Sequence, residues 1–209
     1  MLSFLFPPKC ILCSKLLNRE ETDLCHHCRT ETKKFSNAKR NIPFVAHWTA
    51  IWYYKGNVRK SIHKYKFRNA RSYADVYGRM LAMKLLEEEF DVLTWVPIST
   101  QRRFKRGYDQ SRLLADAVAK ELGIKAVSTL RKTRNTKPQS TLTEAAQRRA
   151  NVLGVYKTKN KDAIAGKRIL LLDDVVTTGA TASECAKTLL TAGAANVRFA
   201  AIAATFYDK

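Results

Sequence analysis

The 209-residue sequence lacks any apolar run long enough to cross a bilayer. Its apolar runs, such as residues 200–204, fall far short of the roughly 18 residues that a membrane-spanning helix needs. The apolar opening at residues 1–8 is too short for the core of a secretory signal, and no basic residue precedes it. Eight glycines and five prolines are too few for a collagen-like or linker-dominated chain. We therefore expect a folded protein of the cytoplasm, where thiols stay reduced.

Acidic residues are also scarce. The sequence has 18 of them against 38 lysines and arginines, which gives a net charge of +20. The excess is uneven, because residues 91–160 carry 15 basic and five acidic side chains, whereas residues 161–209 carry six and five. Such a field suits a polyanion such as nucleic acid or pyrophosphate, or an anionic membrane face. Composition alone leaves a generally basic, solvated surface open as the alternative.

Cysteines are few but ordered. Four of the five form two Cys-x-x-Cys pairs, at Cys10, Cys13, Cys25 and Cys28. Each pair can place two thiolates on one metal ion, and two pairs complete the tetrahedron that zinc prefers. Disulfides are the alternative, and a reducing compartment disfavours them. Residues 1–40 therefore predict a zinc-binding module whose folding depends on the metal.

Two further features of the cysteine pattern are less specific. His26 and His27 lie inside the second pair and could also ligate, although four thiolates suffice. Cys185 stands alone on an apolar face and is expected to be a buried, inert side chain.

Apolar periodicity over residues 41–209 predicts a doubly wound α/β domain. Strands are expected at residues 50–54, 92–96, 126–130, 152–156, 168–172 and 197–204. Helices are expected at residues 58–67, 72–90, 109–122, 141–151 and 181–191, and a basic loop at 132–142. The last strand, helix and strand form a βαβ unit, so the sheet should be parallel with helices on both faces.

The most informative stretch is Leu-Leu-Asp-Asp-Val-Val-Thr-Thr-Gly-Ala-Thr at residues 171–181. Asp173 and Asp174 follow a buried strand, and Gly179 allows a ligand to approach the backbone at the start of a helix. Free N–H groups of the first helical turn then point at an anion. Carboxylates can accept hydrogen bonds from vicinal hydroxyls or hold a divalent ion. The pattern fits a ribose 5-phosphate, and the alternative is an ordinary turn with capping threonines.

The same stretch matches the phosphoribosyl pyrophosphate (PRPP) motif of type I phosphoribosyltransferases. No Walker loop and no Gly-x-Gly-x-x-Gly fingerprint occurs in the sequence. The whole chain resembles the ComF (ComFC/GntX-like) family, in which a four-cysteine zinc element at residues 1–40 would precede a phosphoribosyltransferase-like domain at residues 41–209. The supporting segments are Lys-Tyr-Lys-Phe-Arg at 64–68, Val-Pro-Ile-Ser at 96–99, the basic run at 102–111, Lys-Pro-Gln at 137–139 and Arg-Arg-Ala-Asn at 148–151. One departure is Tyr108-Asp109, where the family more usually has Phe-Asn.

The resemblance implies roles for three groups of residues. The loop that would bind the ribose and its 5-phosphate comprises Asp173, Asp174, Val175, Val176, Thr177, Thr178, Gly179, Ala180 and Thr181. Candidates for binding pyrophosphate are Lys66, Pro97, Ile98, Ser99, Arg102, Arg103, Lys105 and Arg106. Candidates for a mobile lid, within a segment at residues 132–139 that resembles the lid position, are Arg134, Lys137 and Gln139. A second basic residue, Arg68, could also face the site.

The resemblance also implies a function. ComF-like proteins handle incoming single-stranded DNA in natural transformation, with a helicase-like protein of the competence machinery as a possible partner. Mg²⁺ would accompany PRPP, and zinc would be structural. The alternative is an active phosphoribosyltransferase that displaces pyrophosphate from the anomeric carbon of PRPP, for nucleotide salvage or amide phosphoribosylation. Trp48, Trp52, Tyr53 and Tyr54 could stack on bases, although burial habit favours the core.

Overall fold

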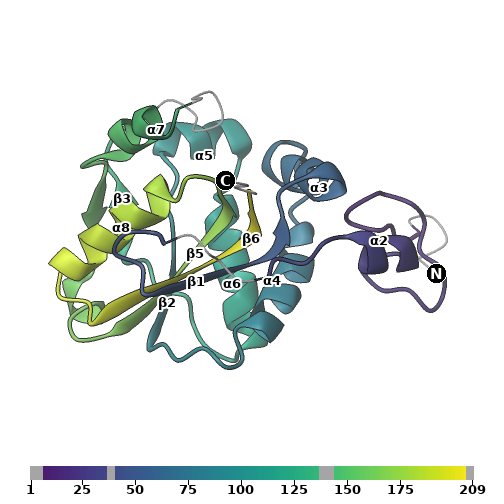
Figure 1. Ribbon diagram of the computed structural model, residues 1–209, viewed down its shortest axis with the longest axis horizontal. Helices are drawn as coiled ribbons and strands as arrows, with labels where there is room; N and C mark the ends of the chain where they lie inside the picture. The colour runs from purple at the N-terminus through teal and green to yellow at the C-terminus, as the bar shows by residue number, and fades with distance from the viewer. Residues whose placement is uncertain (1–6, 37–40, 137–143, 206–209) are drawn as a thin grey trace.

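The main sheet consists of four parallel strands. The computed structural model describes residues 7–36, 41–136 and 144–205. Within them, β1 (His47–Tyr53), β6 (Asn196–Ala204), β5 (Arg168–Val176) and β2 (Val92–Trp95) lie side by side in this order (Figure 1). All three strand pairs are parallel. The helices are α2 (His26–Glu31), α3 (Gly56–Phe67), α4 (Tyr73–Lys84), α5 (Thr100–Arg106), α6 (Gln110–Glu121), α7 (Ala145–Val152) and α8 (Ala180–Thr191), with a short 3₁₀ turn η2 (Lys161–Ala163).

Helices cover both faces of this sheet, as the doubly wound prediction requires. α4 and α6 pack on one face and α8 on the other (Figure 1). Successive side chains of β5 point to opposite faces of the sheet, so they belong to two separate apolar clusters. Leu170 and Leu172 join the apolar cluster with α4 and α6, whereas Ile169 and Leu171 join the cluster with α8. The continuous apolar run is therefore that of a strand buried on both faces, and the predicted fold class is confirmed.

Two predicted strands are displaced and belong to a separate small sheet. β3 (Leu130–Lys132) pairs with β4 (Tyr156–Thr158) in antiparallel register. The strand predicted at 126–130 is wrong, because Ala126 makes only an isolated bridge to β2. The strand predicted at 152–156 is likewise wrong in its bounds, since regular pairing begins at its last residue. Short strands at the edge of the domain bury few apolar residues, so their periodicity is weak.

The helices differ from prediction at two points, and a third prediction stays untested. α5 was not predicted, because it buries none of its residues and has no apolar face. It begins after Ser99 and ends at Gly107, whose φ of 78° favours glycine. α4 ends at Lys84, short of the predicted residue 90. Thr141, which opens the predicted capping box of α7, lies outside the described residues.

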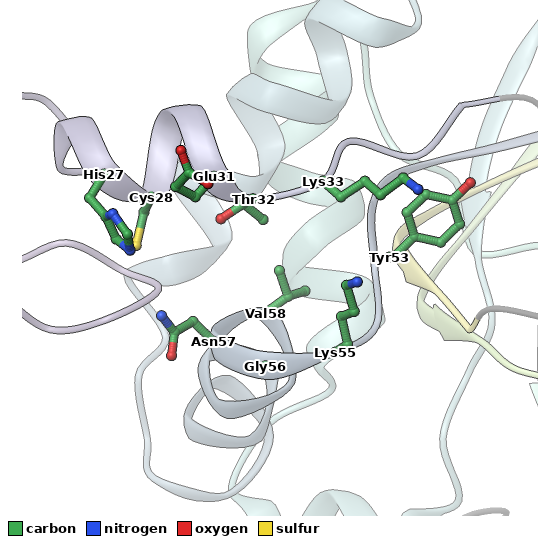
Figure 2. A pocket seen from close by; sticks show the side chains of 10 residues that line it. All are labelled: His27, Cys28, Glu31, Thr32, Lys33, Tyr53, Lys55, Gly56, Asn57 and Val58. Carbon is green, nitrogen blue, oxygen red and sulfur yellow. The ribbon is translucent and has the colours of Figure 1, made fainter.

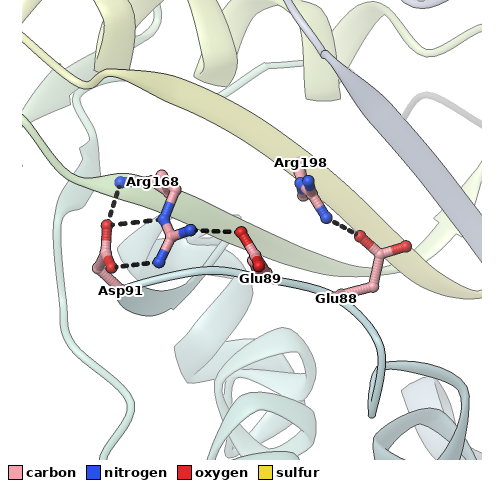
Figure 3. Close-up of polar contacts among 5 residues, drawn as sticks. All are labelled: Glu88, Glu89, Asp91, Arg168 and Arg198. Atoms are coloured by element: carbon pink, nitrogen blue, oxygen red, sulfur yellow. Dashed lines mark hydrogen bonds and ion pairs between the residues drawn. The ribbon is translucent and has the colours of Figure 1, made fainter.

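Ion pairs link the amino ends of β5 and β6 to the segment that precedes β2 (Figure 3). Arg168 reaches Asp91 and Glu89 at 2.9 and 2.6 Å, and Arg198 pairs with Glu88. Hydrogen bonds from Arg168 lower the pKa of Asp91 to about 2. Acidic side chains at this edge are thus neutralised locally. The opposite, carboxyl edge of the sheet is where α/β folds place their ligands.

The N-terminal module packs directly on the main domain beside α3 and α4 (Figure 1). Ile11, Leu12 and Leu24 belong to the same apolar cluster as the buried residues of those helices. A cavity of about 160 Å³ remains between α2 and the start of α3 (Figure 2). The domain boundary predicted at residue 40 stays a prediction, because residues 37–40 lie outside the described residues.

Candidate functional site

The candidate site is the junction between β5 and α8 at the carboxyl edge of the sheet. β5 continues to Val176, so both aspartates belong to the strand, which the sequence predicted to end at residue 172. A short turn follows, and Gly179 adopts φ 77°, a left-handed conformation that side chains disfavour. Ala180 then opens α8, and its N–H donates to the Thr178 hydroxyl at 3.3 Å. The turn presents backbone N–H groups where the helix dipole favours an anion.

The two aspartates have different partners, because neighbouring residues of a strand point to opposite sides. Asp173 accepts hydrogen bonds from the Ser111 hydroxyl at 2.8 Å and from the N–H of Asp174 at 2.9 Å. Asp174 is buried, and its Oδ1 lies 2.8 Å from the Lys66 ammonium. Its Oδ2 is also buried and has no hydrogen-bond partner among the described residues. A buried carboxylate oxygen without a partner is costly, and a donor from a ligand would relieve that cost.

Burial and the neighbouring charge of Asp174 set the protonation of Asp173. Burial, and then the neighbouring charge of Asp174, raise the pKa of Asp173 to about 7, while Lys66 and Ser111 oppose the shift. Near neutral pH Asp173 is therefore present both as the acid and as the carboxylate. As a carboxylate, Asp173 accepts hydrogen bonds, and as an acid it can donate one.

Three half-buried cations lie at or near the pair: Lys66 contacts Asp174, the charge of Asp173 acts on Lys132, and Arg102 is close to Lys132. The Arg102 guanidinium donates to the Thr136 carbonyl at 2.7 Å, and the Lys132 ammonium donates to the Thr136 hydroxyl at 3.0 Å. Burial lowers the pKa of Lys132 to about 8, and the charge of Arg102 contributes to the shift. Two cations held close together at a half-buried position favour the binding of an anion, which would neutralise their repulsion.

The segment after β2 is fixed by two capping side chains. The Ser99 hydroxyl caps α5 and donates to the Asn135 side chain. The Asp109 carboxylate accepts the N–H groups of Ile98 at 3.3 Å and Arg112 at 3.2 Å, so it ties this segment to α6. Each bond uses a different carboxylate oxygen of Asp109. An asparagine, which resembled family members more usually have here, has a single side-chain oxygen. The turn formed by Pro97, Ile98 and Ser99 therefore has a rigid support.

The remaining predicted residues lie differently. Arg103 and Lys105 are exposed on α5. Arg106 stacks on the ring of Phe67 at 4.8 Å and donates to the Gln110 side chain. Arg134 donates to the carbonyl of Leu153 at 3.1 Å. The lid candidates Lys137 and Gln139 lie outside the described residues.

The proposed base-stacking aromatics are largely core residues. Trp48 and Trp52 are buried, and Phe35 packs on Trp48 with ring centroids 5.0 Å apart. Tyr53 and Tyr54 are half-buried. The two tryptophans therefore do not form an open stacking surface. The general tendency of aromatic side chains to be buried predicted their positions correctly.

Four thiols in the N-terminal module form a cluster that fits zinc. The sulfur atoms of Cys10, Cys13, Cys25 and Cys28 lie within 4.8 Å of one another. A tetrahedral zinc ion with bonds of about 2.3 Å places its sulfur ligands roughly 3.8 Å apart. Cys13 and Cys25, at 3.6 Å, already approach that spacing. His26 and His27 are exposed and outside the cluster, as expected if four thiolates suffice. Cys185 is a buried residue of α8, as predicted.

Sequence reasoning missed three residues of the site. Ser111 was only the last residue of the basic run at 102–111, and Lys132 only the first residue of the lid segment at 132–139. Asp109 was noted only because the family more usually has asparagine there. The contact between Ser111 and Asp173 joins positions far apart in the chain, which a single sequence does not reveal. The sequence did hold a signal for Lys132, because residues 131–137 contain four basic residues and no acidic residue, which is typical of an anion-binding segment.

Comparisons with known proteins place these features in two domain families. The phosphoribosyl transferase domain matches residues 109–208, and the double zinc ribbon domain matches residues 1–40. The chain thus combines a phosphoribosyl transferase domain with an N-terminal zinc ribbon. Both the ribbon match and the four-thiol cluster support a structural zinc ion.

Relatives that match most of the chain are named for DNA utilisation and competence. "DNA utilization protein YhgH" of Escherichia coli (strain K12) is 28% identical over 201 residues, 90% of this chain and 87% of that protein. "Competence protein F" of Haemophilus influenzae is 24% identical over 224 residues, 95% of this chain and 97% of that protein. "Competence protein ComFC" of Bacillus subtilis (strain 168) is 22% identical and covers 89% of this chain and 90% of its own. The resemblance to the ComF family is confirmed. None of the helices in the described ranges is long and apolar enough to cross a membrane.

Proposed function

We propose that the chain is a DNA-handling protein of the competence or DNA-utilisation type, with a PRPP or ribose-phosphate binding site at the junction of β5 and α8. The observation that carries the proposal is the buried Asp174, just before the turn into α8. Its Oδ1 contacts Lys66, and its Oδ2 has no hydrogen-bond partner within residues 7–36, 41–136 and 144–205. The relatives named for competence and DNA utilisation support the wider role. A helicase-like partner stays a prediction.

The chemistry of the junction suits a sugar phosphate. The turn from Thr177 to Gly179 and the start of α8 would hold the 5-phosphate. Asp173 and Asp174 would accept hydrogen bonds from ribose hydroxyls, and Mg²⁺ would supply charge neutralisation for the pyrophosphate. The Lys66 ammonium is on a flexible stem, so it can leave Asp174 for the pyrophosphate as hydroxyls take its place. Arg102 and the turn at 97–99 would contact the same group.

The PRPP site is tested by titration calorimetry with PRPP and Mg²⁺. The double variant Asp173→Asn, Asp174→Asn should lose measurable binding, because neutral amides accept more weakly than carboxylates and do not hold a divalent ion. Asp116→Asn is the matched control, since Asp116 lies on the exposed face of α6, where it pairs with Arg112 at 3.5 Å. Unchanged affinity in the double variant would show that the site is misassigned.

Single-stranded DNA binding is tested by its salt dependence. Binding to phosphates releases counterions, so the affinity should fall linearly on a log–log plot against salt, with a slope of about −0.7 per phosphate contacted. Fluorescence anisotropy with an oligothymidylate of about 16 nucleotides measures it. A flat dependence, or no binding at low salt, would rule out the DNA role.

An active phosphoribosyltransferase is the second candidate. It is favoured by the domain match and by the pKa of Asp173, which burial raises to about 7, a value suited to a general base. This function requires Mg²⁺-dependent release of pyrophosphate from PRPP in the presence of a base, amine or amide. No release with any of these acceptors would exclude it. We favour DNA handling, because the basic excess is larger than a small anionic substrate needs.

A further inference from the structure

A groove of about 590 Å³ adjoins the phosphate turn on the side of α7 and α8. Its walls include Phe44, Arg149, Leu153 and Lys187, and its end is formed by Thr178 and Gly179 of the turn itself. We call this surface the α7–α8 groove. A molecule held at the turn by a phosphate therefore has room to continue into the groove.

The groove walls combine apolar and cationic side chains. Phe44 is 52% exposed, and Leu153 is 62% exposed. The Lys187 ammonium lies 5.9 Å from the centre of the Phe44 ring, and Arg149 is exposed nearby. The carboxylate of Glu184, which also lines the groove, accepts the N–H of Gly154 at 2.7 Å. An exposed aromatic ring beside cations is the arrangement that binds a nucleobase and its phosphate.

The phosphate turn and the aspartates restrict which nucleotide fits. A 5-phosphate monoester ends at the turn, whereas the phosphodiester of a DNA strand continues from that phosphate to the preceding nucleoside. The sugar held at Asp173 and Asp174 must offer a hydroxyl, because Oδ2 of Asp174 lacks a donor from the part of the chain that the structure describes. An internal deoxyribose has none, and its 3′-phosphate would be repelled by the two carboxylates. A 3′-terminal nucleotide has a free 3′-hydroxyl and no such phosphate.

We propose that the site captures the 3′ end of a single strand. The terminal 3′-hydroxyl donates to the aspartate pair, the last phosphodiester lies at the turn, and the penultimate base stacks on Phe44 in the α7–α8 groove. Lys187 and Arg149 contact the next phosphate. This inference rests on the proposed function, since it uses the same phosphate site.

Phe44 offers a clean variant for the test. Its φ is 66°, a left-handed conformation that favours glycine, so Phe44→Gly removes the ring without straining the backbone. Phe44→Gly should weaken binding of the oligothymidylate at least about fivefold and leave PRPP binding unchanged. Leu86→Ala, at an exposed apolar residue outside the groove, is the matched control and should change neither. Unchanged oligonucleotide affinity in Phe44→Gly would overturn the groove assignment.

The chemistry of the strand end supplies the second test. Anisotropy is compared for otherwise identical oligonucleotides that end in a 3′-hydroxyl, a 3′-phosphate or a 3′-ribonucleotide. The 3′-phosphate should weaken binding about tenfold or more, because a hydrogen bond to a charged group is lost. The ribonucleotide end should bind at least as tightly, and PRPP should compete with the 3′-hydroxyl strand. Equal binding of all three ends, or no competition by PRPP, would overturn the inference.

The two tests separate this inference from the proposed function. If the strand end has no effect while the aspartate double variant loses PRPP and salt-sensitive DNA binding persists, only the capture of the 3′ end is wrong. If the wild-type protein binds no oligonucleotide at low salt, the DNA role itself fails, and the inference fails with it.

Discussion

Asp173 and Asp174 are adjacent in the chain but lie in different surroundings, and that difference gives each a separate task. Asp174 already has a cation at 2.8 Å, whereas Asp173 is held by the Ser111 hydroxyl and a backbone N–H. The adjacent pair could be predicted from the sequence as a sugar-binding feature. Its internal partners could not, because Lys66 and Ser111 reach it from two other helices.

The protonation of Asp173 predicts a pH dependence of ligand binding. A ribose hydroxyl needs a carboxylate acceptor, and burial together with Asp174 raises the pKa of Asp173 to about 7. Affinity for PRPP should therefore rise from about pH 6 to about pH 8, with proton release at the lower pH. Calorimetry in buffers of different ionisation enthalpy counts those protons. Asp173→Asn should abolish both the slope and the proton release.

The same raised pKa has a consequence for the ligand-free protein. The folded state holds the proton more tightly than the unfolded chain, so Asp173 lowers stability as pH rises from its unfolded pKa of about 4 towards 7. Above about pH 7, Asp173→Asn should unfold at higher urea concentration than the wild type. The binding prediction has its own contradicting result. If the affinity of the wild-type protein for PRPP is constant from about pH 6 to about pH 8, Asp173 is not the titrating group.

Lys132 predicts the alkaline limit of binding. Burial and Arg102 lower the pKa of Lys132 to about 8, so the ammonium is lost in mildly alkaline solution. Phosphate affinity should fall above about pH 8. Lys132→Arg, which keeps its charge, should remove this fall, whereas Lys132→Met should weaken binding at every pH. Lys120→Met, at an exposed lysine in the last turn of α6, is the control, and an equal loss there would indicate a general charge effect.

At the scale of elements, the last strand–helix–strand unit was predictable and the peripheral elements were not. β5, α8 and β6 have strong periodicity because each contributes buried apolar residues to one or both cores. α5 has no buried residue, and β3 and β4 are three residues long, so their patterns are weak. Their positions depend on caps and cross-chain contacts, such as Asp109 with Ile98, which a single sequence does not show.

The close packing of α4 on α6 gives an element-scale prediction. A Cβ on Gly78 would lie 2.6 Å from the Cβ of Ala117 and 3.0 Å from its carbonyl carbon. Gly78→Ala should therefore destabilise the protein by about 1–3 kcal/mol, despite the better helix propensity of alanine. Urea unfolding measures the change.

A double-mutant cycle shows whether this contact is the cause. In an Ala117→Gly background the Cβ clash is absent, so Gly78→Ala should cost clearly less, although the carbonyl carbon still limits the recovery. Costs that are equal in both backgrounds would place the strain elsewhere. The cycle thus tests the helix contact without relying on either single variant.

At the scale of the whole molecule, the distribution of charge differs between the two edges of the sheet. The acids Glu88, Glu89 and Asp91 at the amino edge of the sheet are paired, so the excess positive charge of residues 91–160 is free to act at the other edge. Arg102 and Lys132 belong to that segment and lie at the candidate site. The uneven distribution of charge was visible in the sequence, but which of its cations lie near the aspartates was not.

α3 connects the zinc ribbon to the candidate site. The Ser61 hydroxyl donates to the carbonyl of Ile11 at 2.5 Å, and the Lys64 ammonium donates to the Ser14 hydroxyl at 2.5 Å. Both acceptors lie in or beside the first Cys-x-x-Cys turn. Lys66, at the end of the same helix, contacts Asp174. The packing of the ribbon thus helps to hold the helix that carries a cation to the aspartates.

This connection predicts that metal and ligand stabilise each other. Removing zinc with a chelator should unfold the ribbon, loosen α3 and weaken PRPP binding about fivefold or more, although no thiolate touches the site. Because such coupling is reciprocal, PRPP should slow the release of zinc to a coloured chelator by a comparable factor.

Ser61→Ala separates this coupling from loss of the metal. It keeps all four thiols but leaves the Ile11 carbonyl without its hydroxyl donor, so zinc content should stay at one ion per chain while the effect of PRPP on zinc release shrinks. Ser72→Ala, at an exposed serine that makes no side-chain cap, should behave as the wild type. If zinc release is equally fast with and without saturating PRPP in the wild-type protein, the ribbon and the sugar-phosphate site are energetically independent, and α3 serves only as packing.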